Sequence, residues 1–402
     1  MKKIAIIGGG AAGFFTAANL GEKLGRRTIL FEQSPAPLQK VRISGGGRCN
    51  VTHACFNPVD LVEFYPRGKK ELLSVFTKFQ PGDTMEWFEN RSVALKIEED
   101  NRVFPITDSS LSVIECLLKE TEKNGVEIRY SEGVQSIEKD GDNFIVHTKN
   151  SIYNFEKIIF VPGSSPKAMS MLKNLGHHIV PPVPSLFTFN IKDRRINSLM
   201  GLSFEFAEIR IPDLKLEADG PLLITHWGLS GPAVLKLSAW GAIELNRLAY
   251  DFEIKINFIN KSKEECLEEL DEFRNENAKK SVYSIHPFQF AKRFWRSLLN
   301  YLKIPENLNY SNLNKKQLGQ LADELTDATY KVTGKSTFKE EFVTAGGLDL
   351  KEVNFKNMES RRHKNLFVAG EILNIDAITG GFNFQACWSE SYLITEYLKQ
   401  ID

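Results

Sequence analysis

The stretch Ile4-Ala5-Ile6-Ile7-Gly8-Gly9-Gly10-Ala11-Ala12-Gly13 decides the fold of this chain. Its four leading apolar residues predict a short buried strand. The glycines then follow the spacing G-x-G-x-x-G and open a segment with helical apolar spacing that runs to about Leu24. In this pattern the first glycine permits a tight turn, the second lets backbone N–H groups approach a phosphate, and the third lets the helix pack on the strand. The stretch therefore predicts a dinucleotide-binding domain with a parallel sheet.

An acidic residue follows the next predicted strand, residues 28–31. Glu32 stands where a carboxylate can accept hydrogen bonds from both hydroxyls of an adenosine ribose, and it would repel a 2′-phosphate. This favours FAD or NAD over NADP as the resident dinucleotide. The predicted contacts of the ADP half are Gly8, Gly10, Ala12, Gly13, Glu32 and Gln33.

Composition limits the remaining possibilities. A chain of 402 residues predicts two or three domains, and its formal net charge of zero gives no global attraction to nucleic acid or to an anionic membrane. No apolar run is long enough to cross a bilayer. Five dispersed cysteines without a C-x-x-C pair indicate neither a disulfide framework nor a metal site. We expect a cytoplasmic protein without a bound metal.

A second glycine triplet lies at residues 45–47, between Ser44 and Arg48. It exposes backbone N–H groups beside a cation, which suits the edge or the phosphates of a cofactor. A mobile surface turn is the alternative. The predicted contacts in this segment are Lys40, Ser44, Gly46, Arg48 and Asn50.

The last 40 residues repeat the pattern of strand, glycine and acid. Residues 365–369 predict a strand that ends in Gly370-Glu371, and Asp376 and a glycine pair precede a helix to about Leu398. Such a unit can hold ribityl hydroxyls through Glu371, while the N-terminus of the last helix stabilises negative charge on a reduced flavin. A domain for NAD alone would not need this segment, so the sequence favours FAD. Residues 158–161 predict another buried parallel strand, which ends in the turn Pro162-Gly163. We expect this turn to lie at the cofactor-binding crevice, at the carboxyl ends of the strands.

The middle of the chain has a different composition. Prolines at 181–184 predict a domain boundary, and alternating apolar residues at 186–191, 204–211 and 252–258 predict an antiparallel sheet or barrel. His226, in the segment 226–232, either faces a substrate or is a structural histidine.

Residues 261–333 are helical in pattern and strongly charged. Around Trp295, aromatic residues alternate with Lys292, Arg293 and Arg296. Such a mixture can bind RNA through phosphate contacts and base stacking. More often it is an amphipathic helix with a solvated charged face.

In these segments the chain resembles the BaiN/RdsA-like (YhiN-like, aminoacetone oxidase-like) family of NAD(P)H/FAD-dependent oxidoreductases. The most specific matches are the first glycine motif, residues 43–52, residues 225–233, residues 358–360, and residues 369–371 with 380–385. The resemblance implies an α/β fold, in which a Rossmann-like FAD domain built from both chain ends carries inserted β-barrel and helical domains. The implied ranges are 1–183 and 348–402 for the FAD domain, 184–260 and 334–347 for the barrel, and 261–333 for the helical domain.

The resemblance also assigns site residues. Gly8, Gly10, Gly13 and Glu32 would hold the ADP half, and Val134 would pass the adenine. Additional contacts on the pyrophosphate and flavin side would come from Lys40, Gly46, Arg48, Asn50, Gly163, Gly370, Glu371, Asp376, Gly381, Phe382 and Asn383. Two residues depart from the family pattern, namely Ser164 in a turn that is usually Thr-Gly-Gly-like and Glu390 where a small residue is usual.

The chemistry implied is hydride transfer from flavin N5 to an activated C=C, with a protein acid protonating the neighbouring carbon. Cys49 and His226 are the candidate acids, although Cys49 also fits a buried packing role, and Arg48 is the candidate flavin-side cation. No second G-x-G-x-x-G is visible, so NAD(P)H is expected to bind transiently as the electron donor. The leading substrate is a uridine of 23S rRNA, reduced to dihydrouridine. The alternatives are a small-molecule enone reductase, an aminoacetone-like amine oxidase, and a flavoprotein that acts mainly as an RNA or ribosome partner. The oligomeric state is not predicted.

Overall fold

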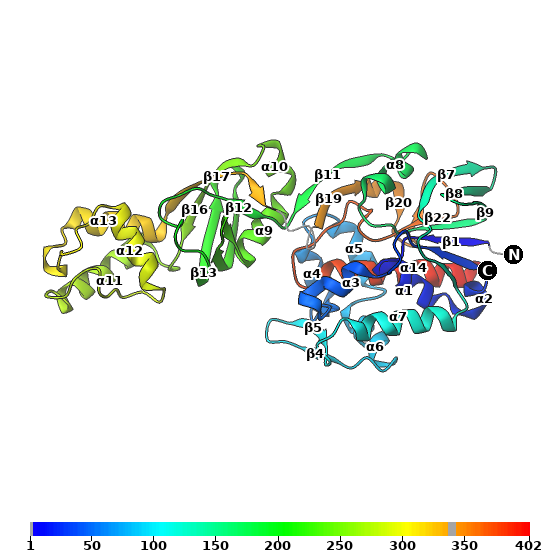
Figure 1. Cartoon of the computed structure of the whole chain (residues 1–402), viewed down its shortest axis with the longest axis horizontal. Helices are drawn as coiled ribbons and strands as arrows, with labels where there is room; N and C mark the ends of the chain where they lie inside the picture. Colours follow the sequence, from blue (N-terminus) through cyan, green and yellow to red (C-terminus); the bar gives the residue numbers. More distant parts are fainter. Residues whose placement is uncertain (1–2, 337–342) are drawn as a thin grey trace. The chain divides into compact units, whose positions relative to one another are not determined.

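The computed structural model describes residues 3–336 and 343–402, which form two compact units (Figure 1). Unit 1 comprises Met1–Val183 and Val343–Asp402, and unit 2 comprises Pro184–Phe342. Unit 1 is therefore built from both ends of the chain, with unit 2 inserted between its two segments.

A seven-stranded sheet lies at the centre of unit 1, in the order β20-β21-β22-β10-β1-β2-β6. Strands β1 (Ile4–Ile7), β2 (Thr28–Phe31), β6 (Glu127–Arg129), β10 (Lys157–Phe160) and β22 (Leu366–Val368) are parallel, whereas β20 (Val353–Asn354) and β21 (Glu359–Ser360) form an antiparallel edge. All four residues of β1 are buried, because both faces of the sheet are covered. This is the doubly covered parallel sheet that the first glycine motif predicts.

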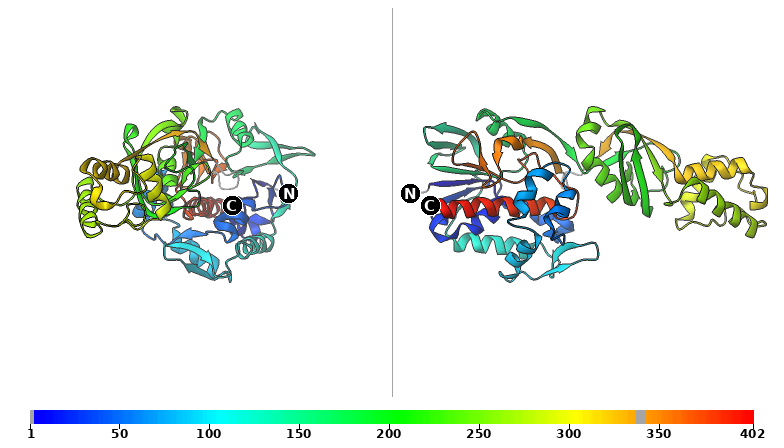
Figure 2. Two further views of the ribbon diagram at one scale, coloured as in Figure 1. Left: turned by 60° about the vertical axis from the view of Figure 1, so that its left-hand side comes forward. Right: turned by 180° about the vertical axis from the view of Figure 1, so that it is seen from behind.

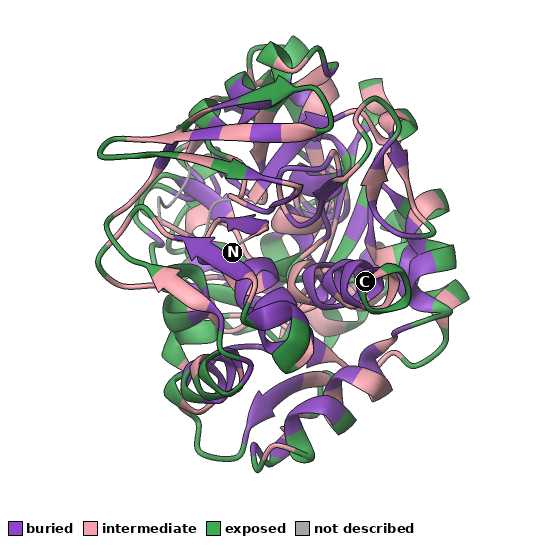
Figure 3. Cartoon of the chain, turned by 90° about the vertical axis from the view of Figure 1, so that its right-hand side faces the viewer, coloured by how far each residue is buried: buried purple, intermediate pink, exposed green. Residues whose placement is uncertain are grey.

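Helices cover one face of this sheet. They are α1 (Ala11–Asn19), α2 (Gly21–Gly25), α7 (Leu111–Lys123) and α14 (Phe382–Ile401). Phe15 of α1 packs on Trp388 of α14 with ring centroids 5.1 Å apart, so the first and last helices lie side by side. Helix α14 is buried along most of its length (Figure 3). The helix predicted to reach Leu24 instead ends at Asn19, because Gly21 adopts φ +72° and starts a separate short helix.

A small antiparallel sheet covers the other face, as the views in Figure 2 show. Its strands are β7 (Val134–Asp140), β8 (Asn143–Thr148) and β9 (Ile152–Phe155). The Phe31 ring of β2 packs on Tyr153 and Phe155 at centroid distances of 5.2 and 6.0 Å. The remaining elements of unit 1 are α3 (Gln39–Ile43), η1 (Ser44–Gly47), β3 (Thr52–His53), α4 (Pro58–Leu61), η2 (Val62–Phe64), α5 (Lys69–Phe76), α6 (Pro81–Glu89), β4 (Leu95–Ile97), β5 (Arg102–Pro105), α8 (Pro166–Asn174), β11 (Ile179–Ser185), β19 (Val343–Leu348) and η5 (Leu350–Glu352).

Unit 2 combines an antiparallel sheet with helices. The strand order is β17-β16-β13-β14-β15-β12-β18. Strand β16 alternates buried Phe252, Ile254 and Ile256 with outward-facing residues, as the sequence pattern predicts. The strands are β12 (Thr188–Asn190), β13 (Ser203–Ile211), β14 (Leu216–Ile224), β15 (Gly228–Ser230), β16 (Asp251–Asn257), β17 (Ala328–Thr333) and β18 (Lys335–Ser336). The helices are η3 (Pro212–Leu214), α9 (Pro232–Trp240), α10 (Ala242–Arg247), α11 (Lys263–Glu276), α12 (Lys292–Tyr301), η4 (Tyr310–Asn312) and α13 (Lys315–Thr326).

Two predicted boundaries need correction. The range 261–333 that is predicted for the helical domain ends in β17 (Ala328–Thr333), which pairs with β16 in the antiparallel sheet of unit 2. Residues 334–347 are predicted to belong to the inserted barrel, and β18 does belong to that sheet. Strand β19, however, pairs with β11 and belongs to unit 1 from Val343 onward. Residues 337–342 of this range lie outside the described residues. Within the part of the chain that is described, none of the helices combines the length and apolarity of a membrane span.

Candidate cofactor-binding site

The first glycine turn forms a cradle whose backbone is open on one side. Gly8 has φ +117°, and a Cβ there would lie 2.4 Å from the Val161 carbonyl oxygen. A Cβ on Gly13 would lie 1.9 Å from the Gly8 carbonyl oxygen, so both positions require glycine for close packing of α1 on the sheet. Gly10 has no neighbouring atom within 4 Å of a Cβ position. Its backbone is therefore free to approach a pyrophosphate at the N-terminus of α1.

The Glu32 carboxylate lies beside this turn. Its Oε2 accepts a hydrogen bond from the Gly9 N–H at 2.9 Å, and its Oε1 accepts from the Ser34 N–H at 2.7 Å. These bonds fix the carboxylate at the end of β2, where a ribose would be held. Gln33 is exposed next to it. A Cβ on Gly133 would lie 2.8 Å from Gln33 Cβ, so the start of β7 at Val134 runs close to this end of the cradle.

The second glycine triplet forms a left-handed turn. Gly45, Gly46 and Gly47 have φ values of +57°, +69° and +86°, and a Cβ on Gly46 would meet no atom within 4 Å. Ser44 closes the turn, because its carbonyl accepts from the Cys49 N–H at 3.0 Å and its hydroxyl donates to the Val41 carbonyl at 2.9 Å. The hydroxyl of Ser44 is thus used within the turn, and Gly46 leaves open backbone for a ligand.

Segments from three parts of unit 1 converge near Glu371. Its carboxylate forms an ion pair with Lys40, and a Cβ on Gly163 would lie 3.8 Å from Glu371 Oε2. Gly370 lies next to Ala12 of α1, because a Cβ on Gly370 would be 3.4 Å from the Ala12 methyl group. The structure therefore brings together residues that the sequence predicts separately from the first, middle and last segments.

An unsatisfied acceptor marks the junction of the second turn with α14. Asn50 Oδ1 is buried and has no hydrogen-bond partner among the described residues. A Cβ on Gly381, at the N-terminus of α14, would lie 2.8 Å from that oxygen. Buried polar atoms normally have a partner, so an acceptor beside a glycine and a helix N-terminus fits a bound polar ligand. The open glycines, Glu32, Glu371 and Asn50 are together a donor and acceptor set that fits FAD.

The side chains of three predicted contact residues in the tail have partners within unit 1, and their contact with a cofactor stays a prediction. The Asp376 carboxylate is wholly buried and is paired with the Arg67 guanidinium, so it holds the loop before α14. The Asn383 amide accepts from the Ala377 N–H at 3.0 Å and donates to the Ala377 carbonyl at 3.3 Å, which closes the same loop. The Phe382 ring is buried.

Phe382 lies in an aromatic stack. Its ring packs on Phe64 and on His53, with centroid distances of 4.3 and 4.5 Å. His53 is a residue that the sequence analysis missed. It is half-buried, its Nδ1 has no partner among the described residues, and burial lowers its pKa. The sequence signal that could have indicated a site role for His53 is its position three residues after Asn50.

The surroundings of Arg48 and Cys49 bear on their predicted roles. Arg48 Nη1 bonds Glu98 Oε1 at 2.6 Å, and its guanidinium lies over the Phe104 ring at 4.0 Å, so its charge is already compensated within unit 1. Cys49 has no exposed surface, and burial raises the pKa of its thiol to about 12. A substrate cannot reach that thiol in this structure, which argues against Cys49 as the proton donor and favours the packing role.

His226, the other candidate acid, lies in unit 2. It is exposed in the turn between β14 and β15, next to Trp227 with ring centroids 5.2 Å apart. Its catalytic role stays a prediction.

The chain matches a known protein family over nearly its full length. The family described as HI0933-like protein Rossmann domain matches residues 2–397. The chain belongs to the HI0933-like family. Its fold class and the resemblance predicted from sequence are thereby confirmed.

Curated relatives of this HI0933-like protein are enzymes by name. It is 28% identical over 407 residues to a ribosomal RNA dihydrouridine synthase of Escherichia coli K12, with 98% of this chain and 97% of the relative covered. It is 24% identical over 409 residues to a 3-dehydro-bile acid delta(4,6)-reductase of Clostridium scindens, with 98% of each covered. Among solved structures, it matches a 3-ketosteroid-delta4-(5alpha)-dehydrogenase of Rhodococcus jostii RHA1 with a TM-score of 0.51, at 10% identity over 98% of this chain and 96% of that one. This HI0933-like protein is an enzyme, a flavin-dependent oxidoreductase.

Proposed function

We propose that the protein is a FAD-dependent reductase that uses NAD(P)H to reduce an activated C=C, with a uridine of 23S rRNA as substrate and dihydrouridine as product. The observation that carries this proposal is the cradle in unit 1, since its parts come from both chain ends and suit a two-part cofactor better than NAD alone. The rRNA substrate is supported by the relative from Escherichia coli that bears this activity in its name.

The residues that would hold FAD divide into two sets. The backbone of residues 8–13 and the Glu32 carboxylate would hold the ADP half, with Val134 beside the adenine. On the other half, Glu371 would accept from ribityl hydroxyls, and Asn50 and the N-terminus of α14 would face the isoalloxazine. When bound and reduced by NAD(P)H, the cofactor supplies a hydride at N5 to an electron-poor carbon.

The proton for the neighbouring carbon has to come from a group that substrate can reach. Cys49 is buried and is unsuited to this role. His53 is half-buried in unit 1, but its lowered pKa makes the charged donor form scarce near pH 7. His226 of unit 2 is exposed and stays a candidate.

The test is the dihydrouridine content of 23S rRNA from cells with and without the gene, read by mass spectrometry. We expect one specific dihydrouridine to disappear in the deletion and to return with the wild-type gene. Unchanged dihydrouridine would contradict the rRNA substrate.

A second candidate is a small-molecule enone as substrate, favoured by the relative named as a bile acid reductase. Anaerobic reoxidation of the reduced flavin by conjugated enones, compared with reoxidation by unmodified rRNA, separates the two candidates. Reduction of the oxidised flavin by aminoacetone would instead indicate an amine oxidase.

A further inference from the structure

Unit 2 carries an exposed segment of one charge sign. Residues 277–305 contain six lysines or arginines and no aspartate or glutamate. All six side chains are exposed, and none has an ion pair within residues 3–336 and 343–402. We call these six the basic surface: Lys279, Lys280, Lys292, Arg293, Arg296 and Lys303.

Hydrogen bonds hold the parts of the basic surface together. Tyr283, which follows Lys280 in the chain, accepts at its carbonyl from Arg296 Nε at 3.1 Å. The Tyr283 hydroxyl donates to the Ile304 carbonyl at 2.8 Å, next to Lys303. Lys280 and Lys303, which lie outside α12 in the sequence, are therefore linked to the helix that carries Lys292, Arg293 and Arg296.

Another cation lies at the edge of this surface. The hydroxyl of Ser297 on α12 donates to the Arg195 carbonyl at 2.8 Å, which docks the loop of residues 192–196 on the helix. Arg195 itself is paired with Asp193 and Glu324, whereas the neighbouring Arg194 is exposed. The positive surface thus extends beyond α12.

The two aromatic residues that lie among the cations of α12 are turned away from solvent, whereas Tyr301 at the end of the helix is 45% exposed. Phe294 and Trp295 have no exposed surface, and Trp295 Nε1 donates to the Val282 carbonyl at 2.7 Å. They pack in the core of unit 2 and are not available to stack on bases. The base-stacking part of the sequence hypothesis is therefore wrong for these two residues, while the cations stay available for phosphates.

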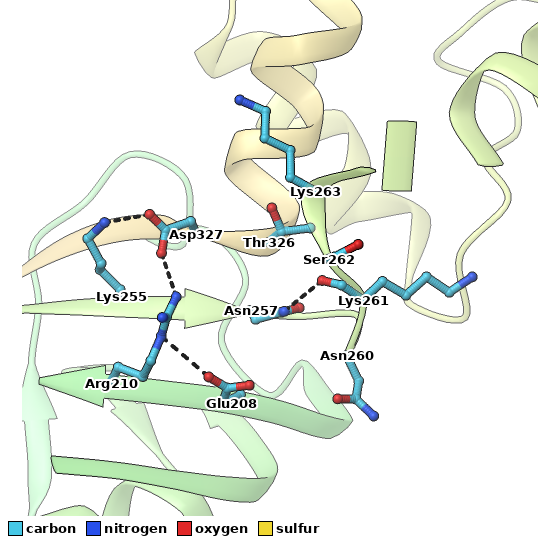
Figure 4. Close-up of a pocket in the computed structure, with 10 residues that line it drawn as sticks. All are labelled: Glu208, Arg210, Lys255, Asn257, Asn260, Lys261, Ser262, Lys263, Thr326 and Asp327. Atoms are coloured by element: carbon cyan, nitrogen blue, oxygen red, sulfur yellow. Dashed lines mark hydrogen bonds and ion pairs between the residues drawn. The ribbon is translucent and has the colours of Figure 1, made fainter. Parts of the chain in front are cut away.

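A pocket of unit 2 also contains several cations, but these are paired with carboxylates. A cavity of about 580 Å³ lies beside the start of α11 and is lined by several cations, but each has a carboxylate partner. Figure 4 shows Arg210 and Lys255 both turned toward Asp327. Lys261 pairs with Glu269, and Lys263 pairs with Asp323. Its charges are compensated, so it attracts phosphate less than the basic surface does.

From this contrast we propose that the basic surface binds the phosphate backbone of double-helical RNA, an inference that rests on the proposed rRNA substrate. Sequence-specific recognition of single strands relies on exposed aromatic rings, whereas duplex RNA is bound through its shape, its phosphates and its 2′-hydroxyls. Unpaired exposed cations release counterions from the duplex when they bind. The partner is thus a helical segment of folded rRNA.

The test compares two triple variants of the full-length protein. The first, Lys292→Gln, Arg293→Gln and Arg296→Gln, removes three charges from the basic surface. The matched control, Lys255→Gln, Lys261→Gln and Lys263→Gln, removes three charges that are already paired. Fluorescence anisotropy with a 20-base-pair RNA duplex at several salt concentrations measures Kd and its salt dependence, and circular dichroism verifies that both variants are folded.

We expect the first variant to bind the duplex about 10- to 100-fold more weakly and to lower the magnitude of the salt slope by about 2 to 3. The control should stay within about threefold of the wild type. Equal binding by the first variant and the wild type would overturn the proposal. So would tighter binding of a single strand than of the duplex, or equal binding of a polyglutamate of the same charge.

A second readout separates this proposal from the proposed function. Dihydrouridine in 23S rRNA is measured in deletion cells that express each variant. Loss of duplex binding together with reduced dihydrouridine supports both proposals. Normal dihydrouridine with the first variant removes the basic surface from substrate binding and leaves the reductase standing. Duplex binding through this surface without dihydrouridine formation by the wild type leaves the surface standing and contradicts the reductase.

Discussion

The Glu390 carboxyl group accepts a 2.6 Å hydrogen bond from the Gly370 N–H, at a position where Glu390 has no exposed surface. Its second oxygen, Oε1, has no hydrogen-bond partner among the described residues. Burial raises the pKa of this carboxyl to about 8, and the bond from Gly370 offsets only part of that effect. A residue inside α14 thus holds the turn that presents Glu371, and it does so in its neutral form at pH 7.

The first prediction concerns the pH dependence of stability. The ordinary glutamate pKa is 4.5, so between this value and about 8 the unfolded chain ionises at residue 390 while the folded chain stays protonated. This contribution to stability is complete below pH 4.5 and is lost as pH rises, by up to about 1.4 kcal/mol per pH unit. Glu390→Gln removes it. Urea unfolding at pH 5.5, 6.5 and 7.5 should show wild type losing stability relative to E390Q as pH rises.

The control for this prediction is Glu396→Gln, on the same helix but part-exposed and paired with Lys399. Its stability difference from wild type should be nearly constant over the same pH range. A constant difference for E390Q as well would show that residue 390 does not titrate in this range.

A pair of glycine substitutions should separate folding from cofactor binding. Gly13→Ala places a methyl group 1.9 Å from the Gly8 carbonyl and should destabilise unit 1 by about 3 kcal/mol or more. Gly10→Ala meets no atom within 4 Å and should leave the stability of the cofactor-free protein within about 0.5 kcal/mol of wild type. Its methyl group occupies the open side of the cradle, so fluorescence titration should show FAD binding weakened about tenfold or more. Normal FAD affinity of G10A would place the cofactor elsewhere.

Glu371 and Asp376 should behave differently although both are acids of the same segment. Glu371→Gln affects an ion pair with the exposed Lys40, so its cost in stability should be below about 1 kcal/mol. Its FAD affinity should fall about tenfold, because a ligand hydroxyl loses a charged acceptor. Asp376→Asn breaks a buried pair with Arg67 and should cost about 3 to 5 kcal/mol. Titration of FAD and urea unfolding of both variants test this, and a reversed pattern would return Asp376 to the cofactor.

We expect Trp295 to contribute to the stability of unit 2 and not to RNA binding. Trp295→Phe keeps most of the buried ring but leaves the Val282 carbonyl without its donor, which should cost about 1 to 3 kcal/mol. RNA affinity of the folded variant should match that of wild type in anisotropy measurements. A large loss of RNA affinity with unchanged stability would mean that this ring does contact bases.

The sequence predicted the sheet and the cradle well because their signals are local. Gly8 and Gly13 are read from spacing alone, and their close contacts in the structure explain why no other residue would serve. The side-chain partners of Asp376, Arg48 and Phe382 cannot be predicted in this way. Each partner is distant in the chain, namely Arg67, Glu98 and His53. Residue type predicts that a carboxylate or a cation needs a partner, but not whether that partner is a ligand or another side chain.

The construction of unit 1 from two distant segments has a consequence for biosynthesis. Strand β22 lies beside β10, and α14 packs on α1, yet both are translated after all of unit 2. While the ribosome is still making unit 2, the nascent chain therefore carries β1 and α1 with part of their apolar surface uncovered. Unit 2 is continuous in sequence and can fold as it emerges, whereas unit 1 has to wait for its last helix. Demand for chaperones should accordingly be greatest for the first 183 residues.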